Sequence, residues 1–356
     1  MSIRTVSADK ATEAAASACQ AGQAALAARL LEHISAVAAA SGENLVFSPL
    51  SVHVALALMS AAAAGDTLDE ILAFVGAPSR DELAEFVGGT VVDRVLADQS
   101  GVGGPSVSFA CGAWTDRRWP LRPAYVDTVV GKFKGNTWAV DFRNEVTKGI
   151  KTADQRLGGR GSRQQIKVLK LPYEMMDEFN CNLYDTLPKF SMCIFLPSGD
   201  KGLQRVVEKI ASSPEFLHDH LPTKSVPVGQ FRLPKFKLAF ERDMAPDLED
   251  LGLKLPFDDE KANMGDMLLQ EHSRGVKVNR VIHKAVIEMN EEGSEAAAVT
   301  VESDDDLGFS LYGDYDVAPI KLVNFVADHP FAFFIVEEES GSIVFVGHVL
   351  DPSTEQ

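Results

Sequence analysis

Residues 276–293 read VKVNRVIHKAVIEMNEEG, and this run constrains the fold more than any other part of the chain. It alternates, it is rich in β-branched residues, and it contains no turn signal before Gly293, so it predicts a long strand over 276–290. The residues that follow, SEAAAV, favour a helix instead, because Ser294 is a good N-cap and alanine has the highest helix propensity. An Ala-rich segment that continues directly from a strand needs an explanation from the rest of the chain.

The composition is that of a globular protein, and the length of 356 residues allows one large domain or two average ones. A net charge of −17 argues against nucleic acid and anionic membranes as partners. No apolar run is long enough to span a membrane, and the N-terminal MSIRTVSADK lacks the apolar core of a signal peptide, so a cytoplasmic location is expected. The cysteines have no CxxC spacing and are interpreted as free thiols: Cys19, Cys111, Cys181 and Cys193.

Strand and helix patterns are mixed along the chain without regular alternation, which predicts an α+β fold with large antiparallel sheets. A long helix is expected within 11–40 and an amphipathic helix over 81–98. SVPVGQFRLPKFKLAF, residues 225–240, is interpreted as a hairpin or a strand pair, and residues 325–352 as two strands around a turn at Gly341. Residues 143–166 are polar, Gly-containing and locally basic, as in a linker.

No known catalytic or nucleotide-binding motif is present, so no enzymatic activity is expected. The Gly-Arg cluster GGRGSR at 158–163 fits the linker better than a phosphate site, because no strand precedes it in the right register. The histidines lack ligand spacing, and His283 on its apolar strand is interpreted as a hydrogen-bonded core histidine. We therefore expect neither a metal nor a cofactor.

Six short segments, in the correct order, resemble the serpin family and its plant branch in particular. The matching segments are the motif with Asn44, Phe47, Ser48, Pro49 and Ser51; IKVLKLPY; FSMCIFLP; FRLPKFKLAF; the turn with Leu248, Leu251, Gly252 and Leu253; and FVADHPFAFFI with GSIVFVGHVLDP. The resemblance implies a single serpin domain over 1–356, with a large antiparallel main sheet, smaller sheets and about eight helices.

The resemblance also explains the Ala-rich segment. The strand 276–290 would be the fifth strand of the main sheet, and residues 291–324 would form the reactive-centre loop. After cleavage by a protease the start of such a loop inserts into the packed main sheet, which requires small residues. The implied hinge residues are Glu291, Glu292, Gly293, Ser294, Glu295, Ala296, Ala297 and Ala298. A helix start in the free loop remains compatible with this interpretation.

Other family positions have matches outside the loop. Ser48, Ser51 and His283 match the hydrogen-bonded network called the shutter, beneath the main sheet. The resemblance implies that Lys235 pairs with Glu291 at the top of this sheet.

The family pattern breaks between Phe142 and Lys167, where members carry several tens of residues more. The missing part would contain the helix that covers the main sheet, its third strand, and strands of the smaller sheets. The fold is therefore expected to be truncated. The fifth strand should lack its inner neighbour, and the shutter should lack an asparagine from the third strand.

The loop departs from the pattern as well. Counting from Gly293 places the scissile bond at Leu307-Gly308, whereas counting back from FVADHPF places it near Asp314. If the hinge alanines face inward on insertion, strand alternation turns Glu302 and Asp304 inward too. Burying unpaired carboxylates costs several kcal/mol each.

These features lead us to expect a non-inhibitory serpin-family protein. The alternative is an active suicide-type inhibitor of serine or papain-like cysteine endopeptidases, and a third interpretation is an interaction or storage protein that uses its acidic loop. An endopeptidase is the expected partner, either cutting the chain as a substrate or being its target. On family grounds, an extracellular location is the alternative to the cytoplasm.

Overall fold

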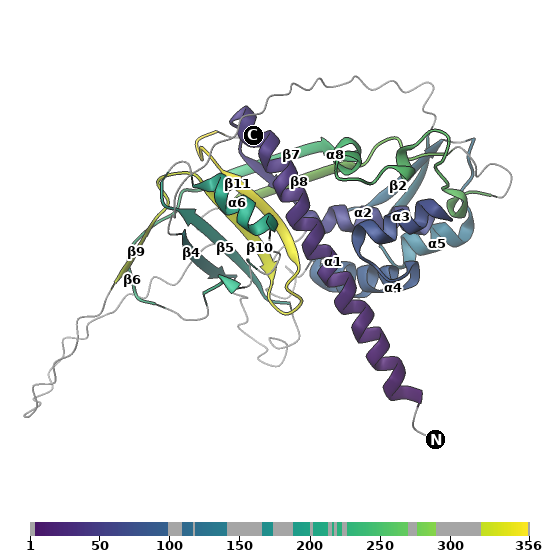
Figure 1. Ribbon diagram of the computed structural model, residues 1–356, viewed down its shortest axis with the longest axis horizontal. Helices are drawn as coiled ribbons and strands as arrows, with labels where there is room; N and C mark the ends of the chain where they lie inside the picture. Colours follow the sequence, from purple (N-terminus) through teal and green to yellow (C-terminus); the bar gives the residue numbers. More distant parts are fainter. Residues whose placement is uncertain are drawn as a thin grey trace, which may run out of the picture.

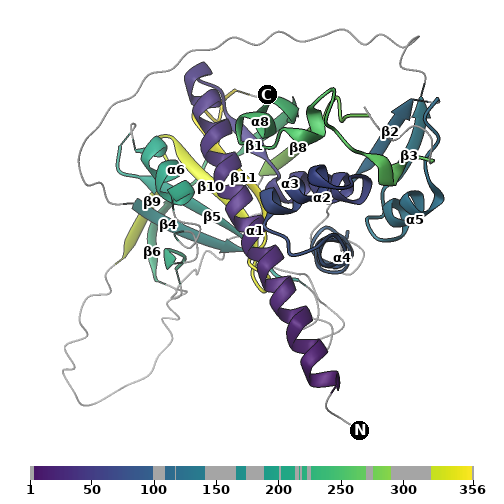
Figure 2. The ribbon, with the colours of Figure 1, turned by 45° about the vertical axis from the view of Figure 1, so that its right-hand side comes forward.

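The computed structural model describes residues 4–98, 109–116, 118–140, 166–173, 188–199, 202–212, 216, 219–222, 226–269, 276–289 and 322–354. Helix α1 (Arg4–Ser41) runs between the largest sheet and the other N-terminal helices, and its first turns project beyond the rest of the molecule (Figures 1 and 2). Of the apolar residues that predicted this helix, Leu26, Leu30, Leu31 and Ile34 are almost completely buried, whereas Val37 is 37% exposed. The predicted helix is confirmed.

The other helices in the N-terminal part of the chain form one layer (Figure 1). They are α2 (Pro49–Ala62), α3 (Asp66–Val75), α4 (Arg80–Glu85), the π-helix η1 (Phe86–Val95) and α5 (Pro123–Gly131). The helix predicted over 81–98 is present as α4 followed without a break by η1, but its hydrogen-bond pattern changes from α to π at Phe86 and it ends at Val95. Gly88 and Gly89, which have low helix propensity, lie in the π-helical stretch, and a side chain at Gly88 would crowd the backbone of Lys132.

The largest sheet has five antiparallel strands in the order β1-β11-β10-β5-β4. Their bounds are β1 (Leu45–Phe47), β11 (Ile343–Val349), β10 (Phe331–Glu337), β5 (Phe190–Pro197) and β4 (Ile166–Pro172). All eight residues of β5 are buried. Phe195 faces the cluster that contains α1 and α6 (Leu203–Ser212), whereas Ile194 faces Phe236 and Ile287 in a second cluster. Hydrophobic packing on both faces explains why this strand is apolar throughout.

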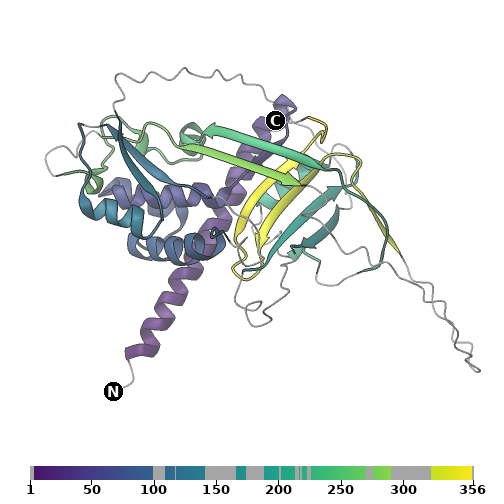
Figure 3. The same cartoon turned by 180° about the vertical axis from the view of Figure 1, so that it is seen from behind.

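Two pairs of strands lie apart from the largest sheet, as Figure 3 shows, and the strand expected as the fifth of the main sheet belongs to one of them. One pair is antiparallel, β7 (Phe236–Asp243) with β8 (Ile282–Met289), and the other is parallel, β2 (Gly112–Asp116) with β3 (Asn136–Val140). Among the described residues β8 has no strand on its other edge, as expected from the truncation.

The predicted strand 276–290 is shorter than expected, because its regular part begins at Ile282. In residues 276–281, which precede β8, the backbone groups form hydrogen bonds that are not part of strand pairing. The N–H of Val278 donates to the carbonyl oxygen of Pro256, and the N–H of Val281 donates to Oδ1 of Asp243. These contacts tie residues 276–281 to η3 and to the end of β7.

Residues 225–240 do not form the predicted hairpin. β6 (Val228–Arg232) pairs in parallel with β9 (Val323–Val326), whereas β7 pairs with β8. Pro234 lies between β6 and β7 and has no N–H to donate, so the chain changes sheets there. The predicted C-terminal hairpin is confirmed as β10–β11, with Gly341 at a φ of 67° in its turn.

Short helices complete the fold: α8 (Ala245–Asp250) and the 3₁₀ turns η3 (Leu255–Phe257) and η4 (Gly265–Met267). Asp247 of α8 is buried and accepts two hydrogen bonds from Arg242 of β7, at 2.7 and 2.8 Å, and one contact of 3.0 Å from Nε2 of His33 on α1. This buried cluster joins the β7–β8 pair to the long helix.

Candidate functional site

The candidate site lies where β8 crosses the start of α2. His283 is on the buried face of β8, and its Nε2 accepts a hydrogen bond of 3.0 Å from the backbone N–H of Ser48. An accepting Nε2 carries no proton. Burial lowers the pKa of His283 to about 4, so the ring is neutral at pH 7. The interpretation of His283 as a hydrogen-bonded core histidine is confirmed.

Ser48 is the N-cap of α2, and its hydroxyl continues the network. Its Oγ accepts hydrogen bonds from the N–H of Ser51, at 3.1 Å, and from the hydroxyl of Ser51, at 2.9 Å. Pro49 occupies the first helical position, where a missing N–H has no cost. The structure thus brings together Ser48, Ser51 and His283, and within the described residues no asparagine side chain bonds to them.

Replacing His283 by leucine should destabilise the chain by about 1–3 kcal/mol at pH 7, because the buried N–H of Ser48 loses its acceptor. Urea unfolding measures this difference. The matched control is Lys284→Ala on the exposed face of the same strand, which removes only the exposed ion pair with Glu241 and should cost less than about 1 kcal/mol. Equal losses in the two variants would show that the histidine does not support the cap.

One other predicted site residue, Lys235, is described by the structure, and it lies outside this cluster. Lys235 lies between β6 and β7, and its proposed partner Glu291 lies outside the described residues, as do the remaining hinge residues, Leu307 and Gly308. The predicted loop ended at 324, but β9 already begins at Val323.

The two-stranded sheets β7–β8 and β2–β3 both expose apolar side chains. On β8, Ile282 and Val286 are about half exposed, beside the ion pairs Lys237–Glu288 and Lys284–Glu241. In the β2–β3 pair, Trp114 and Trp138 lie opposite each other and stack with their ring centroids 4.7 Å apart. Their surface is 57% and 41% exposed, so the sheet face above these tryptophans is open to solvent.

Two further buried histidines were missed by the sequence analysis. His53 on α2 is fully buried with no hydrogen-bond partner for either nitrogen, and burial lowers its pKa to about 4. Burial also lowers the pKa of His348 on β11 to about 4, against the effect of its contact with the carbonyl oxygen of Glu43. The sequence around these two histidines did not indicate a site, because an isolated histidine in an apolar run has no distinctive spacing.

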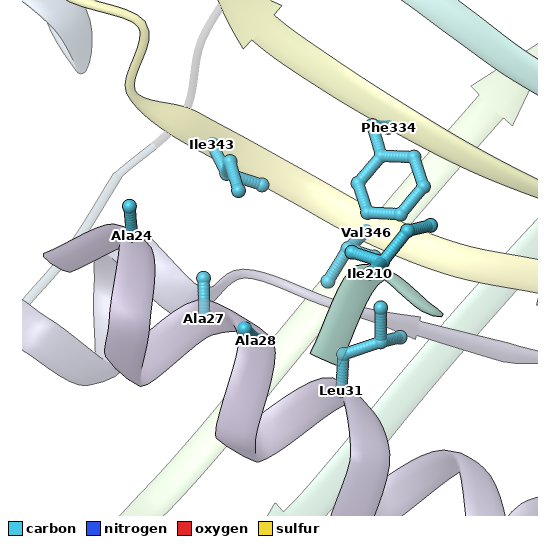
Figure 4. A pocket seen from close by; sticks show the side chains of 8 residues that line it. All are labelled: Ala24, Ala27, Ala28, Leu31, Ile210, Phe334, Ile343 and Val346. Carbon is cyan, nitrogen blue, oxygen red and sulfur yellow. The ribbon is translucent and has the colours of Figure 1, made fainter. Parts of the chain in front are cut away.

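An apolar cavity of about 10 Å³ lies between α1, α6 and strands β10 and β11 (Figure 4). Its walls are formed by Ala24, Ala27, Ala28, Leu31, Ile210, Phe334, Ile343 and Val346. This volume is at the lower limit for one water molecule, and the walls offer no polar partner. The cavity is therefore a packing defect rather than a ligand site.

Other kinds of site are not supported by the described part of the chain. No group of histidine, cysteine and acidic residues there could hold a metal ion. No helix among the described residues is both long and apolar enough to cross a membrane.

Comparison with known proteins identifies the family. The family model described as Serpin (serine protease inhibitor) matches residues 21–156 and 151–352. The chain therefore belongs to the serpin family, and the predicted serpin fold, truncated in its main sheet, is confirmed.

The similar proteins are plant serpins. Putative serpin-Z5 of Oryza sativa subsp. japonica is 38% identical, over 92% of this chain and 89% of its own length. Serpin-ZX of Hordeum vulgare is 36% identical, over 91% and 94%. Among solved structures, Arabidopsis AtSerpin1 in its native stressed conformation has a TM-score of 0.76 and 28% identity, covering 94% of this chain and 99% of that one.

Proposed function

We propose that this chain is a non-inhibitory member of the serpin family, whose reactive-centre loop is cut as a substrate by endopeptidases. The observation that carries the proposal is the division of the main sheet. β8 and β2 belong to separate two-stranded sheets, with no strand between them among the described residues. A cleaved loop that entered here would have β8 on one side only, so it would gain fewer ladder hydrogen bonds than insertion between two strands provides.

The comparisons support a missing segment at this place. The two stretches matched by the family model meet at residues 151–156, inside the linker 143–166. The alignment with Putative serpin-Z5 spans 405 positions but holds 92% of this 356-residue chain, or about 328 residues, so about 77 positions face a gap. The acidic loop supports the same proposal, because insertion would bury Glu302 and Asp304.

A suicide-type inhibitor of serine or papain-like cysteine endopeptidases is the second candidate. The hinge favours it, since Ser294 and the three alanines at 296–298 are small enough to enter a packed sheet. This candidate requires that insertion be faster than hydrolysis of the acyl-enzyme. An incomplete slot slows insertion, so we rank it second.

Incubation with chymotrypsin, trypsin or papain should yield a cleaved chain and no covalent adduct on denaturing electrophoresis. Mass spectrometry of the fragments should place the cut within residues 301–321, the span that the two ways of counting leave open. The same proteases with their nucleophiles chemically blocked serve as the control and should leave the chain intact. A denaturant-resistant adduct with the unmodified chain would overturn the proposal and establish the second candidate.

A further inference from the structure

The two-stranded ribbon β6–β9 gathers exposed apolar side chains that no part of the mechanism above uses. It lies at the edge of the molecule, away from the helices (Figures 1 and 3). The ribbon surface consists of Val226, Val228, Phe231, Leu322 and Val323, which are between 42% and 59% exposed. No other pair of strands in the described part of the chain carries as many large exposed apolar residues. A concentration of this kind marks an interaction surface.

The backbone of β6 offers an edge for pairing. The N–H of Gln230 donates to Oδ1 of Asn324 at 2.8 Å, and the carbonyl oxygen of Arg232 accepts from the N–H of Ala327 at 2.9 Å. Both neighbours of Phe231 therefore bond toward β9. Because backbone groups alternate in direction along a strand, the N–H and C=O of Phe231 point away from β9. Within the described residues no strand pairs with this edge.

The stretch that contains β6 lacks acidic residues, unlike the chain as a whole. The chain carries a net charge of −17, so carboxylate repulsion opposes association over most of its surface. Residues 226–240 are an exception, with Arg232, Lys235 and Lys237 and no acidic residue. Two copies that meet here bring no carboxylates of this stretch together.

We propose that two copies of this chain associate through β6. The strands run antiparallel about Phe231, whose N–H and C=O bond to the same residue of the second copy. The two ribbons then form one four-stranded sheet, in which the apolar side chains of β6 from the two copies lie side by side. Pro227 and Pro234 bound the pairing segment, since neither has an N–H to donate. Both copies use the same edge of β6, so this edge is occupied in each copy and the contact closes as a symmetric dimer.

Light scattering coupled to gel filtration, on the full chain over a wide concentration range, tests this proposal. We expect a dimer that dissociates on dilution, and a monomer for Phe231→Lys, because a lysine on an edge strand opposes pairing. Val228→Lys repeats the test without removing the contact between Phe231 and Phe325, in case loss of that contact unfolds the ribbon. The matched control is Val286→Lys, at a similarly exposed valine on β8, which should remain dimeric.

Oxidative cross-linking tests the register. Directly opposite residues in a hydrogen-bonded pair have Cα atoms about 5.5 Å apart, which suits a disulfide. Phe231→Cys should therefore form a dimer that is resistant to denaturant and lost on reduction, whereas Val286→Cys and the unmodified chain should not. The proposal fails if the unmodified chain is monomeric at every concentration. It also fails if Val286→Lys abolishes the dimer while Phe231→Lys and Val228→Lys retain it.

Discussion

Rebuilding the missing segment should convert this chain from a protease substrate into a protein that forms a covalent adduct. The design replaces residues 143–166 by the corresponding segment of Serpin-ZX, which we expect to add a strand beside β8, and combines this with Glu302→Ala and Asp304→Val. An inserting loop then has a neighbour on each side and no longer buries the carboxylates of Glu302 and Asp304. Denaturing electrophoresis after incubation with chymotrypsin, trypsin or papain measures the adduct.

The two repairs should not be equivalent. Glu302→Ala with Asp304→Val alone should give no adduct, because the slot between β2 and β8 remains incomplete. A Gly/Ser segment of the same length as the graft controls for the added chain and should also leave a substrate. Cleavage should raise the melting temperature of the rebuilt protein, since the inserted strand adds ladder hydrogen bonds, but not that of the unmodified chain. If cleavage raised the melting temperature of the unmodified chain strongly, insertion would be possible without the third strand.

Sequence patterns were sufficient to predict the elements whose apolar residues are most deeply buried. β5, β10 and β11 are apolar runs bounded by turn residues, and α1 carries a helical apolar stripe, so local pattern and tertiary packing agree there. The meeting of Ser48 and His283, 235 residues apart, came from the family resemblance rather than from local pattern.

The remaining features depend on contacts between distant segments. Alternation in β6 and β7 is the same for a hairpin as for two strands in different sheets, so only the tertiary partners decide between them. Trp114 stacks on Trp138 because the parallel register of β2 and β3 places them opposite each other, and Gly112 leaves room for the ring of Trp138. The lack of partners for His53 follows from how α2 is buried on nearly all sides, which no spacing in the sequence reveals.

The buried histidines should make the chain sensitive to mild acid. Burial lowers the pKa values of His53, His283 and His348 from 6.5 to about 4 in the folded protein. The unfolded chain therefore binds protons first as the pH falls below 6.5. The stability that the neutral histidines contribute is fully present above pH 6.5, is lost progressively below it, and is gone near pH 4. One pKa unit is worth about 1.4 kcal/mol, so each histidine accounts for a loss of roughly 3 kcal/mol.

His53→Leu isolates this effect, because the ring of His53 has no hydrogen-bond partner to lose. Between pH 7.5 and pH 4.5 the variant should lose less stability in urea unfolding than the unmodified chain, by about 2 kcal/mol. Carboxylates titrate equally in both proteins and cancel in the comparison. The control His220→Leu removes an exposed histidine and should leave the pH dependence unchanged. Equal losses of stability in His53→Leu and the unmodified chain would contradict this prediction. The acid response would then arise from the carboxylates, and protonation of the buried His53 ring would not destabilise the fold.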